Sequence, residues 1–328
     1  MILKQIATIR KYEHWPSFDL VYEWEDILCK ELGLKLYYQS QYCKNHKVLS
    51  IPFSDRLLCP FNNTFIYEMS PVGLNEKKRC FNHSNIIPCI IDFFLDDNDL
   101  ERFVARYYKN PIVCVSSMEV YDFIANKPTI ASALNIRHLP LSISDKYAIH
   151  KDTKINKEYD MILVGRQNPV LNEFVKIYAN KHPDFSYVYR IIKNGIFNYY
   201  DNFGKYLGNI NNRADYMNLI KKGRCGLYST PGIDGGEIRT KGFNQVTPRF
   251  LELVASGCHI VARYKKNPDT TYYELEKFSP SIDSYEQFEQ IVDTARSTDV
   301  DMEFYSKYLN KHYTSVRAKQ LYKLVTEL

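Results

Sequence analysis

Short apolar segments alternate with amphipathic segments through the second half of the chain. Residues 159–165 form a mostly apolar run, and residues 169–182 follow with apolar positions at helical spacing, which predicts a buried strand and then a helix. The same reasoning predicts further strands at 187–192, 224–229 and 259–262 and further helices at 213–222 and 248–256. Because strands that alternate with helices build βαβ units, we expect a parallel sheet in this half.

The first half of the chain shows the same alternation less regularly. Strands are predicted at 2–9, 34–38, 86–94, 112–116 and 136–139, and helices at 18–32, 99–108 and 117–126. The polar, lysine-containing segment 141–157 has the composition of a linker. We therefore expect an α/β protein of two Rossmann-like domains, residues 1–150 and 151–328, whose parallel sheets face a central cleft. A long amphipathic segment at 303–326 predicts one final helix. One expected position for this helix is against the N-terminal domain.

Composition narrows the class of protein. The 328 residues are 45% hydrophobic and 25% charged, which is typical of a soluble globular chain of about two domains. The apolar runs end well before the roughly 18 residues of a membrane span, and residues 1–10 lack the apolar core and cleavage site of a secretory signal. A net charge of +5 without a basic–aromatic motif argues against a nucleic-acid partner. We expect a cytoplasmic protein.

Several common functional motifs are absent from the sequence. It contains neither a P-loop nor the glycine fingerprint of dinucleotide-binding dehydrogenases. Two Cys-x-x-His pairs, Cys43 with His46 and Cys80 with His83, have the side chains of a zinc site, but the pairs are far apart and lack a compact knuckle. We therefore expect neither a bound metal nor a cofactor.

The most informative segment begins at Thr247. Thr247 is a good N-cap and Pro248 suits the first helical position, so a helix start is well marked. The free N–H groups of such a helix start attract an anion, and Arg249 adds a fixed positive charge in the first turn. Glu252, one turn further on, is placed to accept hydrogen bonds from two ribose hydroxyls; an ordinary amphipathic helix with Glu252 in solvent is the alternative. From the ribose role we expect Glu252→Ala to abolish activity with little loss of fold.

Other cations and small residues follow the predicted strands of the same half. The predicted strand 159–165 ends in Gly165 and is followed by Arg166, and basic Lys241 lies in the glycine-containing loop before Thr247. Three more candidates end the strand 224–229, namely Tyr228, Ser229 and Thr230. Since the carboxyl ends of parallel strands share one edge of a sheet, we expect these groups to converge on a diphosphate.

With these motifs, residues 157–328 resemble the nucleotide-sugar-binding domain of GT-B glycosyltransferases of the glycosyl transferases group 1 type. The resemblance rests on residues 159–166, 216–228 and 249–257. It implies that Glu252 holds the donor ribose, that the helix start holds the diphosphate, and that no metal is needed. It further implies a hexosyltransferase-like enzyme, a nucleotide-diphosphate sugar donor and a glycan or lipid-linked oligosaccharide acceptor. Enzymes of this group often build bacterial surface polysaccharides at the inner face of the membrane, with peripheral membrane contact.

The sequence departs from the group's pattern at one place. Many retaining members carry Glu-x7-Glu, but the residue eight positions before Glu252 is Asn244, and Glu237 is only a distant substitute. The stereochemical outcome of the transfer therefore stays open. His14, after the first strand, and Asp92, late in a buried strand, are the candidates for general base.

Two alternatives stay open beside the GT-B interpretation. Asp97 and Asp99 form an Asp-x-Asp motif, which in GT-A glycosyltransferases binds a divalent metal at the donor diphosphate, although Asp99 is equally a good helix N-cap. A non-catalytic nucleotide-sugar-binding protein would keep Arg166, Arg249 and Glu252 but lack a working base.

Overall fold

The chain is divided into two compact units. The computed structural model describes residues 1–11, 13, 16–39, 61–69 and 82–328. Unit 1 comprises Met1–Ser144, Arg239–Gln245 and Thr314–Leu328, and unit 2 comprises Asp145–Ile238 and Val246–Tyr313. The division near residue 144 falls inside the polar segment expected as a linker, and two short C-terminal stretches belong to unit 1.

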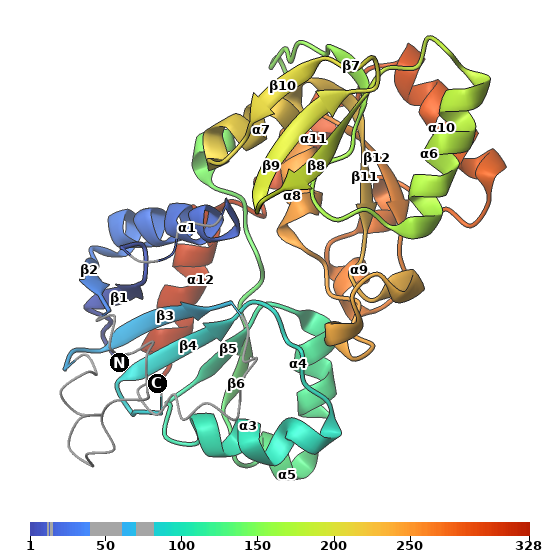
Figure 1. The fold of residues 1–328 in the computed structure, drawn as a ribbon. Helices are drawn as coiled ribbons and strands as arrows, with labels where there is room; N and C mark the ends of the chain where they lie inside the picture. Colours follow the sequence, from blue (N-terminus) through green and yellow to red (C-terminus); the bar gives the residue numbers. More distant parts are fainter. Residues whose placement is uncertain (12, 14–15, 40–60, 70–81) are drawn as a thin grey trace. The chain divides into compact units, whose positions relative to one another are not determined.

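Unit 1 is built around a six-stranded sheet in the order β2-β1-β3-β4-β5-β6 (Figure 1). Its strands are β1 (Gln5–Thr8), β2 (Lys35–Tyr38), β3 (Thr64–Glu68), β4 (Ile86–Ile90), β5 (Val113–Val115) and β6 (Ile136–His138). Every neighbouring pair is parallel, as predicted. Of these strands, β3 was not predicted.

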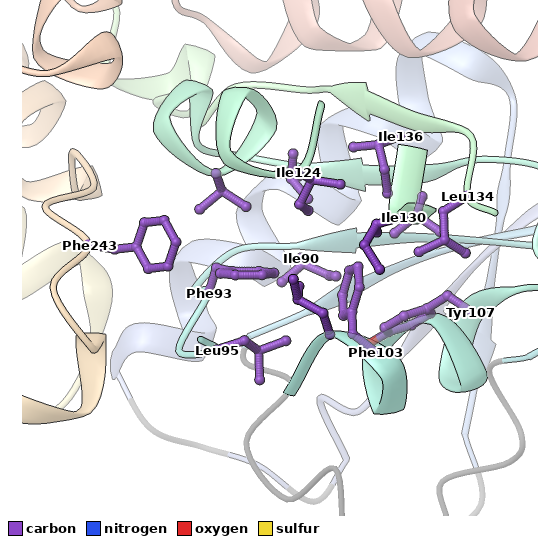
Figure 2. Packing of buried hydrophobic residues seen from close by; sticks show 14 residues of the cluster. Ile90, Phe93, Leu95, Phe103, Tyr107, Ile124, Ile130, Leu134, Ile136 and Phe243 are labelled. Atoms are coloured by element: carbon purple, nitrogen blue, oxygen red, sulfur yellow. The ribbon is translucent and has the colours of Figure 1, made fainter. Parts of the chain in front are cut away.

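Helices cover both faces of this sheet. On one face α1 (Pro16–Leu32) and α12 (Thr314–Thr326) pack against a core that includes Cys89 and Cys114. On the other face lie α3 (Leu100–Tyr107), α4 (Met118–Ala125) and the short α5 (Pro128–Ala131). Figure 2 shows the core under these three helices, where Phe243 of the stretch 239–245 packs against Phe93 with ring centroids 5.4 Å apart.

Unit 2 contains a second six-stranded sheet, in the order β10-β9-β8-β7-β11-β12. Its strands are β7 (Tyr159–Ile162), β8 (Tyr187–Lys193), β9 (Ile196–Asp201), β10 (Tyr206–Asn209), β11 (Gly223–Ser229) and β12 (His259–Arg263). The four strands predicted from the sequence are mutually parallel. The sheet is not wholly parallel, however, because β9 and β10 continue it in antiparallel fashion.

The sequence contained a signal for this antiparallel extension. Asn194 and Gly195 join β8 to β9 with φ of 51° and 77°. An Asn-Gly pair with positive φ at both residues is the preferred two-residue hairpin turn. The prediction of a purely parallel sheet was wrong here because it followed the helix–strand alternation and did not weigh this turn.

Helices again lie on both faces of the sheet (Figure 1). α6 (Pro169–Lys181) and α10 (Tyr285–Ser297) share a core with the central strands. α7 (Arg213–Lys221), α8 (Pro248–Ala255) and α11 (Met302–Leu309) pack with the other face, and α9 (Pro268–Tyr272) follows β12. Unit 2 is thus a three-layer α/β domain of Rossmann-like type, as is unit 1.

The final helix predicted at 303–326 is interrupted. α11 ends at Leu309 and α12 begins at Thr314, and the two helices belong to different units. Between them His312 stacks on Tyr273, with ring centroids 5.4 Å apart, and is buried. Tyr305, Tyr308, Leu309 and Tyr313 keep helical spacing up to the residue before α12, so periodicity alone concealed the break. In the described residues no helix has the length and apolar character needed to cross a membrane.

Candidate functional site

The topology of unit 2 marks one edge of its sheet as a candidate binding site. From β7 the chain continues to β8 on one side, and it later returns to β11 on the other side of β7. In open α/β sheets, ligands bind beyond the carboxyl ends of the strands at such a switch point. Residues 163–168, between β7 and α6, and residues 230–247, between β11 and α8, follow these two strand ends. Five of the nine predicted binding residues lie in these two segments, namely Gly165, Arg166, Thr230, Lys241 and Thr247.

Gly165 and Arg249 are in direct contact at this edge. Gly165 has φ of 69°, and a Cβ atom at this position would lie 1.5 Å from Nη2 of Arg249. Nη1 of Arg249 donates a hydrogen bond of 2.8 Å to the carbonyl oxygen of Arg166. A glycine is therefore required at position 165 for two reasons, backbone conformation and the close approach of the guanidinium. The first turn of α8 is thereby joined to the turn after β7.

Helix α8 begins at the residue predicted from the sequence. Thr247 is the N-cap residue and Pro248 occupies the first turn, but the Thr247 side chain makes no capping hydrogen bond. The Thr247 backbone N–H instead donates to the hydroxyl oxygen of Tyr228 over 3.1 Å. Tyr228 is buried, which raises the pKa of its hydroxyl well above the usual value. The positive end of the α8 dipole is thus not neutralised by a capping side chain.

Two buried polar atoms near this contact lack a hydrogen-bond partner among the described residues. They are Nε of Arg249 and Oε1 of Gln167. The Gln167 amide nitrogen donates to the carbonyl oxygens of Val164 and Gly165, over 2.8 Å and 3.3 Å, which fixes the orientation of the amide. Buried polar groups are normally paired. One buried donor and one buried acceptor beside this contact are therefore unsatisfied by the described residues.

Two further arginines belong to the same edge. Arg166 is exposed and forms an ion pair of 2.6 Å with Glu237. Arg190, in β8, lies over the ring of Phe197 and interacts with the Tyr199 hydroxyl. Burial raises the pKa of Tyr199, while the positive charges of Arg190 and Arg249 oppose that shift. Sequence reasoning missed Arg190, although an arginine inside a strand of otherwise apolar character was a signal.

Glu252 has protein partners for its carboxylate. Its side chain is 6% exposed and forms an ion pair of 2.5 Å with Arg213, the first residue of α7. The Tyr216 hydroxyl donates to its other oxygen over 3.2 Å. Burial, with a contribution from the Glu252 charge, raises the pKa of Tyr216. The carboxylate is neither solvent-exposed nor open to a ribose in this arrangement; it ties α8 to α7.

The remaining predicted binding residues are distributed between the units. Thr230 is buried and Ser229 is half-buried at the end of β11. Lys241 belongs to unit 1, where its Nζ lies 3.0 Å from Asp96 and 2.5 Å from Asp99. These carboxylates raise the pKa of the Lys241 ammonium. Lys241 is thus engaged within unit 1, and the rest of the predicted binding set lies in unit 2.

Of the candidate bases and metal ligands, Asp92, Asp97 and Asp99 lie in unit 1. His14 lies outside the described residues, as do Cys43, His46 and Cys80 of the cysteine–histidine pairs. Asp92 follows β4, half-buried, and its backbone N–H donates to the Met69 carbonyl oxygen over 2.8 Å.

The Asp-x-Asp motif is occupied by protein cations. Asp97 pairs with Lys127 and Asp99 with Lys241, each over 2.5 Å. The Lys241 hydrogen bond holds the pKa of Asp99 below its usual value. Asp99 also ends the short 3₁₀ turn that precedes α3, in a capping box with Asp96. Within the part of the chain that the structure describes, no group of three or more His, Cys, Asp or Glu side chains is arranged to hold a metal ion.

Comparison of the sequence with known proteins assigns the chain to no family. No family model matches the chain, and no curated protein sequence is significantly similar to it. Any function must therefore be argued from the residues at the switch point of unit 2.

Proposed function

We propose that the chain is a GT-B glycosyltransferase that moves a sugar from a nucleotide-diphosphate donor to a glycan or lipid-linked glycan. The observation that carries the proposal is the contact of Arg249 with the turn at Gly165. It places a fixed guanidinium and the positive end of α8 at the switch point of a Rossmann-like sheet. This combination suits a diphosphate in the absence of a P-loop.

Three arginines bring positive charge to this edge of the sheet. Arg166, Arg190 and Arg249 bring three positive charges, of which one is paired with Glu237. Guanidinium groups bind phosphate oxygens in bidentate fashion and stabilise the negative charge of a departing diphosphate. We therefore expect transfer to proceed without a divalent metal and to continue in the presence of EDTA.

We propose that the nucleoside contacts Gln167 and not Glu252, the partner expected from the sequence. Because Glu252 already pairs with Arg213, ribose recognition by Glu252 is not part of the proposal. The unpaired Oε1 of Gln167 lies in the turn that Arg249 contacts. A hydroxyl or N–H group of the nucleoside would satisfy this acceptor.

Acceptor activation is assigned to the N-terminal domain, as in the group that the sequence resembles. Asp92, at the carboxyl end of β4, and His14 are the proposed alternatives for general base. The proposed setting is synthesis of a bacterial surface polysaccharide in the cytoplasm, with peripheral contact to the inner face of the membrane. The basic net charge of +5 favours contact with anionic lipid.

Nucleotide binding is the first test of the proposal. Isothermal titration calorimetry with UDP, GDP, ADP, CDP and dTDP should show binding of at least one diphosphate by the wild-type chain. Arg249→Gln should weaken that binding by about tenfold or more, because a charge-assisted hydrogen bond is worth roughly 1.5–3 kcal/mol. Lys266→Gln, which removes an exposed charge paired with Glu276, is the matched control and should bind as wild type. The proposal fails if no diphosphate binds, or if Arg249→Gln binds as well as the control.

A transfer assay then separates enzyme from binding protein. The diphosphate that binds identifies the sugar nucleotides to be tested with glycan and lipid-linked acceptors. Release of the nucleoside diphosphate that persists in EDTA supports a metal-independent transferase. Strict dependence on added manganese would contradict the GT-B proposal, and binding without turnover would leave the non-catalytic alternative.

A further inference from the structure

The loop 230–238 lies between β11 and the stretch 239–245. Hydrogen bonds of Asp234, in the middle of this loop, hold it in place. The carboxylate of Asp234 accepts hydrogen bonds from Nε and Nη2 of Arg263, over 2.6 Å and 2.9 Å. It also accepts one of 2.8 Å from the side chain of Asn168, the N-cap residue of α6. Asp234 has φ of 53°, and its bond with Arg263 lowers the pKa of its carboxyl group. The loop is thereby held against β12 and the start of α6.

The same loop places a second carboxylate, that of Glu237, at the candidate site. Glu237 lies three residues beyond Asp234 and pairs with Nη1 of Arg166 over 2.6 Å. The side chain of Glu237 is 16% exposed, whereas that of Arg166 is 46% exposed. The carbonyl oxygen of the same Arg166 accepts the bond from Arg249. A negative group of the protein therefore sits on one of the cations that the proposed diphosphate would use.

We infer that Glu237 is a charge gate for the donor: its carboxylate holds Arg166 in the free protein, and a phosphate group of the donor replaces it. The inference rests on the proposed function, because it assigns a specificity role at that same site. A ligand that brings no phosphate to Arg166 leaves the Arg166–Glu237 pair in place. A diphosphate has more negative charge than the single carboxylate that it displaces, so the exchange favours diphosphates over uncharged nucleosides.

The cost of opening the gate is small. A partly exposed ion pair contributes at most about 1 kcal/mol, and the diphosphate must break the Arg166–Glu237 pair when it binds. Removal of the Glu237 charge should therefore tighten diphosphate binding by about two- to fivefold. Asp234, and not Glu237, makes the contacts of the loop with Arg263 and Asn168, so these contacts do not depend on the Arg166–Glu237 pair.

The experiment is a double-mutant cycle read by calorimetry. Inorganic pyrophosphate and the nucleoside diphosphate that binds best are titrated into wild type, Glu237→Gln, Arg166→Gln and the double variant. Glu237→Gln should bind both probes two- to fivefold more tightly, with binding of the uncharged nucleoside unchanged. In the Arg166→Gln background the Glu237→Gln change should have no effect, because the pair has already been removed. Glu276→Gln, an equal charge change at an exposed pair, is the control.

The outcomes separate the gate from the function on which it rests. If wild type binds a diphosphate and Glu237→Gln binds it equally or more weakly, the gate is refuted and the diphosphate site remains. If Glu237→Gln tightens binding equally with and without Arg166, general repulsion explains the gain and the gate is again refuted. If none of the variants binds pyrophosphate or a diphosphate, both the gate and the proposed function fall.

Discussion

Replacement of Glu252 tests whether this residue is a structural partner of Arg213. The pair is buried, with both side chains 6% exposed and Nη1 and Oε1 2.5 Å apart. Removal of one member of such a pair leaves the other charge buried, which costs roughly 3–5 kcal/mol. Tyr216 also loses its acceptor, which adds about 1 kcal/mol. Glu252→Leu should therefore destabilise unit 2 by about 4–6 kcal/mol, contrary to the expectation from the sequence that the fold would be little affected.

The stability of the double variant, compared with that of each single variant, distinguishes loss of the ion pair from simple loss of packing. Arg213→Met should destabilise unit 2 by a similar amount, since it leaves the buried Glu252 carboxylate with the Tyr216 hydroxyl but without its ion-pair partner. Combining Glu252→Leu with Arg213→Met replaces the pair by apolar groups, and such replacements are often neutral or stabilising. The double variant should accordingly be more stable than either single variant.

Urea unfolding followed by circular dichroism gives the free energies, and hydrogen exchange of unit 2 amides assigns the loss to that unit. At roughly 2–4 °C per kcal/mol for a domain of this size, each single variant should melt about 8–24 °C lower. The reasoning is refuted if Glu252→Leu costs less than about 1 kcal/mol, or if the two single losses add in the double variant.

Two other predictions follow from the contacts. Gly165→Ala should cost about 1–2 kcal/mol from its positive φ, and it should abolish diphosphate binding in calorimetry because a Cβ would displace Arg249; unchanged binding would contradict the assigned contact. Burial, opposed by a hydrogen bond with the Ser116 carbonyl, lowers the pKa of His138 to about 4. The unfolded chain then binds more protons between pH 4 and 6.5, so unit 1 should lose up to about 3 kcal/mol as pH falls through this range. A His138→Gln variant with the same pH slope in urea unfolding would disprove the assignment.

Local signals were sufficient for much of the secondary structure. The predicted strands and helices lie within a few residues of the observed ones, because their apolar periodicity reflects faces that pack on a sheet. The start of α8 was predicted from Thr247 and Pro248, whose preferences depend only on the adjacent backbone. The break between α11 and α12 was missed, since an aromatic spacing does not show which unit each helix packs against.

The chain by itself therefore determined the class of fold and the position of the α8 helix start, which depend on neighbours within a few residues. Tertiary structure decided the partners of the charges. Glu252 forms its ion pair with Arg213, which is distant in sequence. Lys241 pairs with Asp96 and Asp99 of unit 1. Arg249 was brought to Gly165 because β7 and β11 are adjacent in the sheet. A charged side chain finds its partner across space, and no local pattern in the sequence specifies which distant group that will be.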